Sequence, residues 1–428
     1  MSGCDTAFVL ISTALVLLMT PALGFFYGGL VRSKNALNTL MMSVSAAGCV
    51  GVAWALLGYS IAFAPGSLWS GGLDHALLEG VGLEARGSVP TLAFFAFQAT
   101  FAIVTAALVS GAIVERMRFG AYLAFITAWS LVVYAPMAHW VWGDGFLARL
   151  GALDFAGGTV VHVNAAAAAL VAALVVGPRK DYARQAVLPH SVPFVVLGAG
   201  LLWFGWFGFN AGSALAANAQ ASLAFANTLL APAATLMMWT HLDLVRSGRV
   251  TAVGAATAIV VGLVAITPAA GFVSPLLALA IGAIAAAPSY FGLLVRARTR
   301  LDDSLDVVAA HGLGGTLGAL LTGVFASKAW TSPADGLMFG ATRQLAVQLL
   351  AVLVAIVWSA AMTFVLLKLI ALITPLRVGS REEGLGLDVS QHGEEAYARE
   401  EGAILILPDA DVPRPVAVAA PATEGGRA

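Results

Sequence analysis

Two histidines inside long apolar stretches are the clearest candidates for chemistry in this sequence. His162 lies in GGTVVHVNAAAAAL and His311 in AAHGLGGTLGAL, each among small residues. An ionisable group in an apolar segment is costly, so its presence points to function. Imidazole both donates and accepts hydrogen bonds and is a common metal ligand. Two alternatives stay open: neighbouring backbone satisfies each ring, or the pair holds a metal ion, although neither has a cysteine or carboxylate at ligand spacing.

Aromatic residues at helical spacing form a second candidate site, suited to a small cation. Trp206, Phe209 and Ser213 fall at i, i+3 and i+7 on one helix face. Phe101 and Trp142, from two other apolar stretches, can face the same outer vestibule. Cation–π attraction would bind a cation there without a carboxylate, and the hydroxyl adds one hydrogen-bond acceptor. The alternative is an ordinary aromatic belt at the membrane interface.

The composition requires a membrane setting for both candidate sites. Of 428 residues, 60% are hydrophobic and 11% charged, and the mean hydropathy is +0.89. These values exclude a soluble globular domain and a disordered chain. The net charge of -1 also excludes a nucleic-acid binder. We therefore expect an all-α polytopic protein in a lipid bilayer.

The apolar runs predict eleven transmembrane helices. They lie near residues 6–31, 40–63, 91–113, 119–142, 157–177, 192–212, 222–243, 251–270, 273–295, 306–326 and 341–374. Loops after odd-numbered spans hold 12 basic residues, against 4 near the even-numbered loops. Because basic loops stay in the cytoplasm, the N-terminus is expected outside and the C-terminus inside. The expected location is the plasma (inner) membrane, as a multi-pass protein.

The positions of the histidines suggest an inverted repeat. Spans five and ten run in opposite directions, yet each carries a histidine with an aspartate upstream, Asp154 and Asp306 respectively. We expect helices 1–5 and 6–10 to be the two halves, with helix 11 unpaired, and His162 and His311 to meet near the midplane. Both aspartates begin helices and are expected to serve as N-caps.

The composition changes near residue 375. We expect residues 1–375 to form the membrane domain and residues 376–428 to form a cytoplasmic regulatory tail. This tail holds ten acidic residues and no apolar run of span length. From about residue 409 it is rich in Pro, Ala and Gly and is expected to be disordered.

Five stretches of the chain resemble the ammonium transporter family, bacterial Amt type, with the yeast Mep and animal Rh proteins as wider relatives. They are FYGGLVRSKN, AFQATFAIVTAALVSGAIVERMRF, DFAGGTVVHVNAAAAALVAALVVGPRK, GWFGFNAGSA and GLDVSQHGEEAY. The resemblance runs from about Thr6 to Tyr397. It implies a homotrimer of eleven-helix protomers, each with a narrow hydrophobic pore for ammonium or ammonia, and methylammonium as an analogue. It implies no enzyme activity, cofactor or metal.

Motif by motif, the resemblance assigns roles to the aromatic site. The outer ammonium site would comprise Phe101, Trp142 and Ser213, with Asp154 supporting it from beneath. Phe101 stacked above Phe209 would be the gate. One departure is Asp144 at the mouth, where many members have Gly, and it could raise the local cation concentration.

The same resemblance makes His162 and His311 the twin pore histidines, with Trp206 lining the pore beside them. Moving ammonium into a low-dielectric pore is costly, whereas ammonia is neutral. Deprotonation at the gate, followed by conduction of ammonia, is therefore the expected mechanism. The sequence leaves open whether the released proton also crosses.

Two further expectations concern regulation and alternatives. The segment GLGLDVSQHGEEAY, Gly386–Tyr397, resembles the family's tail motif and predicts control by a PII-type signalling protein. The main alternative function is an ammonium sensor that signals through the tail with little flux. A metalloenzyme built on the histidine pair is a third, weaker alternative.

Overall fold

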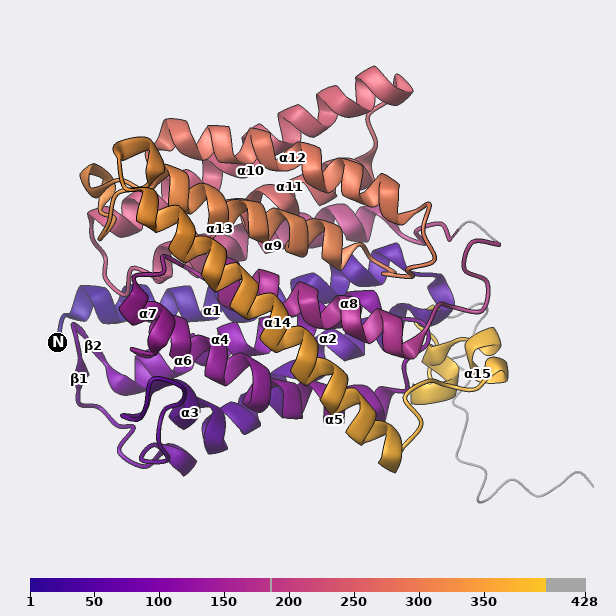
Figure 1. Ribbon diagram of the computed structural model, residues 1–428. Helices are drawn as coiled ribbons and strands as arrows, with labels where there is room; N and C mark the ends of the chain where they lie inside the picture. Colours follow the sequence, from indigo (N-terminus) through magenta and orange to yellow (C-terminus); the bar gives the residue numbers. More distant parts are fainter. Residues whose placement is uncertain (185–186, 398–428) are drawn as a thin grey trace, which may run out of the picture.

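The computed structural model describes residues 1–184 and 187–397, and this part of the chain is almost entirely helical. Long helices lie side by side in one bundle (Figure 1). The only paired strands in the described ranges are β1 (Ala85–Arg86) and β2 (Val89–Pro90), an antiparallel hairpin. The α-helices are α1 (Gly3–Leu30), α2 (Ala36–Ala53), α3 (Tyr59–Phe63), α4 (Thr91–Leu108), α5 (Phe119–Trp129), α6 (Ala135–Trp142), α7 (Phe146–Leu150), α8 (Asn164–Val176), α9 (Val192–Gly212), α10 (Ala219–Ser247), α11 (Ala252–Ile266), α12 (Pro275–Arg296), α13 (Gly314–Phe325), α14 (Thr342–Ile373) and α15 (Ser380–Leu385).

Shorter helical segments extend or join these helices. The 3₁₀ segments are η1 (Ser33–Asn35), η3 (Ala76–Leu78), η4 (Val109–Ala112), η8 (Lys328–Trp330) and η9 (Leu337–Phe339). The π-helical segments are η2 (Trp54–Gly58), η5 (Ser130–Tyr134), η6 (Gly158–Val163), η7 (Val308–Leu313) and η10 (Asp388–His392). Because π-helical turns are rare and concentrate at functional sites, their positions direct attention to particular residues.

Ten helical stretches of the described chain are long and apolar enough to cross a bilayer. They are Gly3–Leu30, Ser33–Phe63, Thr91–Ala112, Phe119–Leu150, Gly158–Val176, Val192–Gly212, Ala219–Ser247, Pro275–Arg296, Val308–Phe325 and Thr342–Ile373. Helix α11, at the place of the eighth predicted span, is apolar but has only 15 residues. The expected all-α polytopic architecture is confirmed. The number of eleven spans and the orientation stay predictions.

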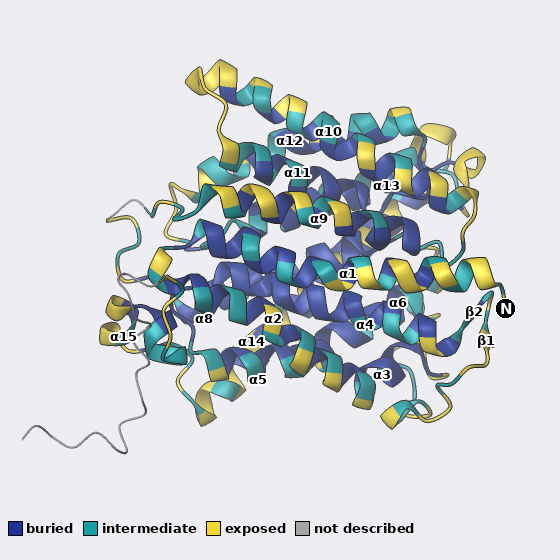
Figure 2. Ribbon diagram, turned by 180° about the vertical axis from the view of Figure 1, so that it is seen from behind, coloured by how far each residue is buried: buried dark blue, intermediate teal, exposed yellow. Residues whose placement is uncertain are grey.

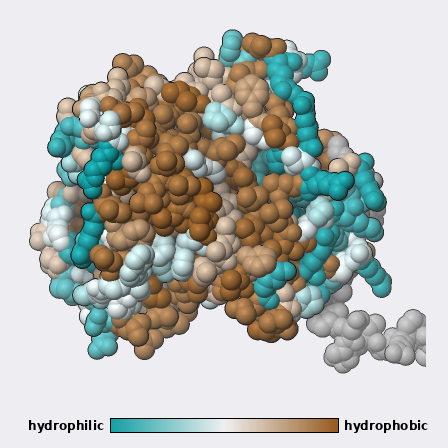
Figure 3. Space-filling view, in the orientation of Figure 1, coloured by the Kyte–Doolittle hydropathy of each residue, from teal (hydrophilic) through white to brown (hydrophobic). Residues whose placement is uncertain are grey.

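The surface of the bundle is suited to lipid. Buried residues concentrate along the middle of the bundle (Figure 2), and a broad hydrophobic band lies between hydrophilic ends (Figure 3). Helix α14 runs obliquely across the outside of the bundle and packs against α5, α8 and α13. Large apolar side chains on it are exposed, such as Val357 and Leu372. In water such a surface would drive association, whereas in a bilayer hydrocarbon covers it.

The two ends of the bundle differ. The N-terminus lies at one end of the bundle, which we call the N-terminal end. Helix α15 lies at the opposite end, which we call the tail end (Figure 1). At the tail end, Asp388 accepts hydrogen bonds from the backbone N–H groups of Leu37 and Asn38 in the first turn of α2. Glu383 is buried and accepts from the Lys180 backbone and the Arg377 guanidinium.

The described part of the tail therefore packs against the loops of the tail end. Residues 376–397 are anchored because their acidic side chains cap a helix and bind loop groups, which composition alone does not reveal. The stretch expected to be disordered after about residue 409 lies outside the described residues. The division into domains at residue 375 stays a prediction.

A buried charge cluster joins three loops at the tail end. The Glu115 carboxylate binds Arg32 at 3.0 Å and Arg179 at 2.6 Å, and Arg179 also binds Asp302 at 2.8 Å. Burial alone would raise the pKa of Glu115, but the charges and hydrogen bonds of Arg179 and Arg32 outweigh it and lower the pKa to about 2. Glu115 is thus ionised at neutral pH and ties these loops together.

Candidate functional site

The structure brings His162 and His311 together inside the bundle. Their Nδ1 atoms lie 3.2 Å apart, and the ring centroids lie 5.2 Å apart. Both residues are buried, with 1% and 3% of their surface exposed. A hydrogen bond between two Nδ1 atoms requires that one carries a proton and the other does not. The buried Nε2 of His162 has no hydrogen-bond partner among the described residues.

Each histidine lies in a π-helical segment that continues into an α-helix. His162 is in η6, which leads into α8, and His311 is in η7, which leads into α13. The two segments contact each other, so the same local irregularity occurs on both sides of the pair. A wider helical turn re-aims the side chains that it carries, which accounts for its use here.

Aspartates eight residues before the histidines hold the starts of these segments. The two oxygens of Asp154 accept hydrogen bonds from all four backbone N–H groups of residues 157–160, at 2.6 to 3.0 Å. Asp303 accepts from the N–H groups of Val307 and Val308 at 3.1 and 2.8 Å. These bonds satisfy donors that have no partner within the helix.

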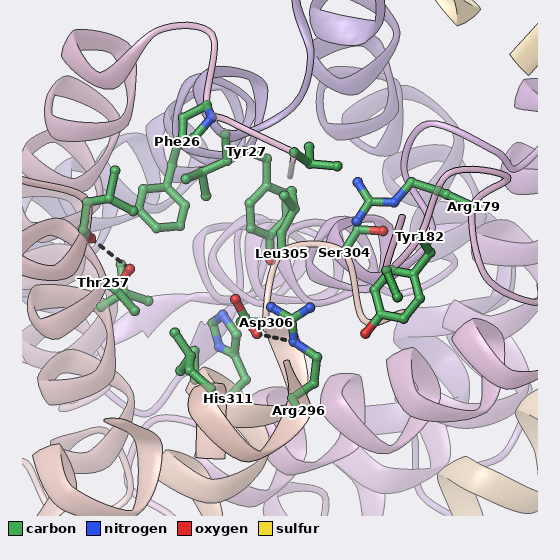
Figure 4. A pocket seen from close by; sticks show the side chains of 18 residues that line it. Phe26, Tyr27, Arg179, Tyr182, Thr257, Arg296, Ser304, Leu305, Asp306 and His311 are labelled. Carbon is green, nitrogen blue, oxygen red and sulfur yellow. Dashed lines mark hydrogen bonds and ion pairs between the residues drawn. The ribbon is translucent and has the colours of Figure 1, made fainter. Parts of the chain in front are cut away.

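The expectation that Asp306 caps this segment is wrong, because Asp303 takes that position. Asp306 has a positive φ of 60° and pairs with Arg296, with Nε and Oδ1 2.7 Å apart. The spacing from Asp303 to His311 equals that from Asp154 to His162, so Asp303 is the symmetric counterpart. Figure 4 shows Asp306 and Arg296 facing a cavity near His311.

The two glycines of the DFAGG motif, which begins at Asp154, have a steric reason. Gly157 has a φ of 115°, which an L side chain rarely adopts, and a Cβ on Gly158 would lie 2.5 Å from the ring of Pro268. The two glycines let the chain turn sharply over the Asp154 carboxylate and approach Pro268. Larger residues at these positions would displace the segment that carries His162.

Two phenylalanines lie stacked near the histidine pair. The Phe101 and Phe209 ring centroids are 4.1 Å apart with an interplanar angle of 19°. On the histidine side, Trp206 stacks on His162 at 5.4 Å. The Trp206 indole donates to Thr267 Oγ1 at 2.8 Å, which fixes the orientation of its ring.

A cavity of about 320 Å³, here the vestibule, lies on the Phe101 side of this stack. Trp142 lines it beside Phe101, with ring centroids 6.0 Å apart, and donates its indole N–H to Asp154 O at 2.8 Å. Ser213 also lines it and donates its hydroxyl hydrogen to Phe209 O at 2.9 Å, which leaves oxygen lone pairs free to accept. The lining includes no carboxylate.

Two further cavities continue from the stack toward the tail end. A narrow cavity of about 20 Å³ is lined by Phe209, Trp206 and both histidines. This volume holds about one water-sized molecule. A third cavity of about 310 Å³ is lined by His311 together with Tyr27, Arg296 and Asp306 (Figure 4). Phe101 borders only the vestibule and Phe209 only the narrow cavity, so the ring pair separates the two spaces.

Comparison with known proteins agrees with this arrangement. Residues 7–397 match the model of the Ammonium Transporter Family. An ammonium transporter of Bacillus subtilis (strain 168) is 46% identical over 398 residues, which covers 92% of this chain and 98% of that protein. This chain belongs to the ammonium transporter family.

Solved structures of the ammonium transporter family share the fold. Mep2 from Candida albicans matches with a TM-score of 0.85 and 35% identity, over 92% of this chain and 90% of that one. A structure titled "Sensor Amt Protein" matches with a TM-score of 0.85 and 30% identity, over 91% and 98%. As a member of the ammonium transporter family, the chain is a multi-pass membrane protein and not an enzyme.

Three polar residues of this ammonium transporter family member lie in other places or have other partners than the sequence pattern indicates. Asp144 does not line the vestibule, and its exposed carboxylate pairs with Arg149 at 3.0 Å. Gln98 lines the vestibule, although no feature of its sequence pattern marks it. Asp303, and not the expected Asp306, caps the segment of His311, and its spacing of eight residues from the histidine is the sequence signal that marks it. No group of three metal-binding side chains occurs in the described ranges.

Proposed function

We propose that this protein conducts ammonium-derived nitrogen through the path from the vestibule past the stacked phenylalanines to the histidine pair. The observation that best supports this proposal is the order of features along the path. An aromatic vestibule is followed by a closed pair of phenylalanine rings, a cavity for one molecule with two buried histidines, and a wider cavity beyond. Each part has a chemical task in moving ammonium, and family membership makes ammonium the substrate to test.

Binding comes first. An ammonium ion in the vestibule meets the faces of Phe101 and Trp142 and the free lone pairs of Ser213. Each aromatic face contributes roughly 0.5–2 kcal/mol to holding a cation. No carboxylate lines the vestibule, so the ion is held without a strong charge partner that would prevent its release.

Deprotonation follows at the phenylalanine pair: one N–H bond of ammonium breaks, ammonia keeps the electron pair and passes Phe209, and the proton goes to water in the vestibule, since no carboxylate lines that cavity. Beyond Phe209 the lining is almost entirely apolar, and an ion that enters it loses its hydration at a large cost. Ammonia avoids this cost because it is neutral. Potassium has no proton to lose and is therefore rejected at the same place.

The histidine pair then offers a hydrogen-bonding surface to ammonia in the narrow cavity. The Nδ1 atoms are engaged with each other, so the unpartnered Nε2 of His162 is the group left for the passing molecule. The Asp154 carboxylate is fully occupied by four backbone N–H groups. We therefore assign it a positioning role beneath the site and not direct contact with substrate.

The test compares wild type with His162→Ala and His311→Ala in proteoliposomes. Either change leaves a buried imidazole without its only described partner, so we expect flux of ammonium or labelled methylammonium to fall about tenfold or more. His241→Ala, on the exposed surface of α10, is the matched control and keeps wild-type flux. Recording membrane current in the same vesicles decides whether the proton crosses with ammonia. Unchanged flux in both pore variants would contradict the proposal.

A sensor is the second candidate, because one matching structure is titled "Sensor Amt Protein" and because residues 376–397 are anchored to the loops of the tail end. In that case the vestibule binds ammonium and the tail reports it. Wild-type protein that binds ammonium but gives no uptake above protein-free vesicles would favour the sensor.

We further propose a homotrimer in the plasma membrane and a PII-type signalling protein as partner at the tail end. The sequence motif Gly386–Tyr397 and family membership support both. Mass measurement of the detergent-solubilised protein tests the first. A pull-down under high and low nitrogen supply tests the second, and binding that does not depend on nitrogen status would remove it.

A further inference from the structure

A glutamine in the vestibule has no role in the scheme above. Gln98 lies on α4 three residues before Phe101, and its side chain lines the vestibule together with Phe101, Trp142 and Ser213. It is 8% exposed, although glutamine side chains are mostly exposed in proteins. Gln98 and Ser213 are the two polar side chains in the lining of this cavity.

The amide of Gln98 is unsatisfied. Its Oε1 is buried without a hydrogen-bond partner among the described residues. Its Nε2 takes part in no side-chain hydrogen bond in the same part of the chain and borders the vestibule. A buried acceptor without a partner is costly, and native structures rarely retain one without a reason. Because neither end is tied to the protein, the amide is free to turn its oxygen toward a ligand.

The chemistry of the cavity defines that ligand. The aromatic rings and the free lone pairs of Ser213 attract a small cation that carries N–H donors, and an amide oxygen is a further acceptor for such donors. Ammonium has four N–H groups, and methylammonium has three. An additional directional acceptor therefore benefits ammonium more than methylammonium.

We propose that Gln98 is a specificity-determining residue whose amide oxygen accepts a hydrogen bond from ammonium in the vestibule. The inference rests on the proposed function, since it names a further ligand at the same site. It assigns Gln98 to binding and leaves the later steps unchanged. Loss of the acceptor then raises KM and leaves the maximal rate intact.

The test measures uptake against ammonium concentration in proteoliposomes for wild type, Gln98→Met and Gln98→Glu. Methionine keeps the length and unbranched shape of glutamine but removes the acceptor, so we expect KM to rise roughly three- to tenfold, the factor for one hydrogen bond to a charged group. The rise is smaller for methylammonium. Glutamate keeps the acceptor and adds negative charge, so we expect its KM to fall below wild type.

Gln220→Met is the matched control, because Gln220 stands at the start of α10, outside the lining of the vestibule, and binds backbone carbonyls of Gly271 and Thr331. We expect its KM to equal the wild-type value. An unchanged KM in Gln98→Met overturns the inference, as does a lower maximal rate with unchanged KM, which would indicate a purely structural role. If Gln98→Met does not fold, a KM for Gln98→Glu at or above the wild-type value overturns it. Absence of saturable uptake in wild type would instead refute the proposed function.

Discussion

Single side chains in this protein act mainly by positioning others. Asp154 shows this most clearly, because both oxygens of its carboxylate accept hydrogen bonds from backbone N–H groups in the turn that leads to His162. Asp303 does the same for His311 with two bonds instead of four. Trp142 adds a further link, since it lines the vestibule and also holds the Asp154 carbonyl.

Asp154 accepts four backbone hydrogen bonds and Asp303 only two, and this difference gives a prediction at the residue scale. In Asp154→Asn one accepting oxygen becomes an amide donor that faces two N–H groups, so we expect loss of about 2–3 kcal/mol of stability and of most flux. Asp303→Asn exposes one N–H group to the same conflict and should cost about half as much. Thermal unfolding in detergent, together with uptake in proteoliposomes, measures both. Equal effects of the two substitutions would contradict the assignment.

The histidine pair and the aromatic site could be predicted from the sequence. Histidines are rare within apolar runs, and few sets of aromatic and polar residues share one helix face there. The role of Gln98 could not be predicted, because placing an uncharged amide in a membrane costs far less free energy than placing a charged group there. The choice between Asp303 and Asp306 as the cap could not be made from the sequence, because several aspartates precede His311 and only the backbone geometry shows which one accepts the N–H groups. The close stacking of Phe101 on Phe209 depends on packing between α4 and α9, which spacing within one helix does not determine.

At the scale of elements, the π-helical segments and the loop cluster carry the specific architecture. Segments η6 and η7 place the two histidines against each other. No known residue preference predicts such π-helical turns from the sequence. The Glu115 cluster fixes the loops at the tail end, against which residues 376–397 pack. Basic residues in those loops were expected for topology, but their binding to a buried carboxylate appears only in the fold.

The Glu115 cluster predicts an acid-sensitive contribution to stability. The pKa of Glu115 is about 2 in the folded protein, below its ordinary value of 4.5. A lowered folded pKa means that the contribution is complete above pH 4.5 and is lost as the pH falls through about 2. Glu115→Gln removes this contribution, so we expect it to cost about 3–5 kcal/mol at pH 7.

The difference in unfolding midpoint between wild type and Glu115→Gln should therefore shrink between pH 4.5 and pH 2. Thermal unfolding in detergent at a series of pH values checks this. Glu382→Gln is the control, because Glu382 is only partly buried and lies 3.8 Å from Arg118 in a looser pair. A difference for Glu115→Gln that stays constant over this range would contradict the cluster as described.

For the whole molecule, the scarcity of charge predicts the membrane fold well. The apolar runs anticipate the ten long helices and the short α11 to within several residues, because hydrocarbon thickness sets the length of such segments. They do not anticipate the oblique path of α14 or the packing of residues 376–397, since both depend on contacts between distant parts of the chain. The same scarcity of charge leaves the narrow cavity nearly apolar, which is the basis of the proposed selectivity.

The most direct test of this account compares two labelled cations in the same proteoliposomes. Methylammonium can lose a proton at the phenylalanine pair, whereas rubidium, an analogue of potassium, cannot. We expect the protein to accelerate methylammonium uptake well above protein-free vesicles and to leave rubidium uptake unchanged. Equal acceleration of both cations, or of neither, would contradict the central claim that this pore admits its substrate by removing a proton.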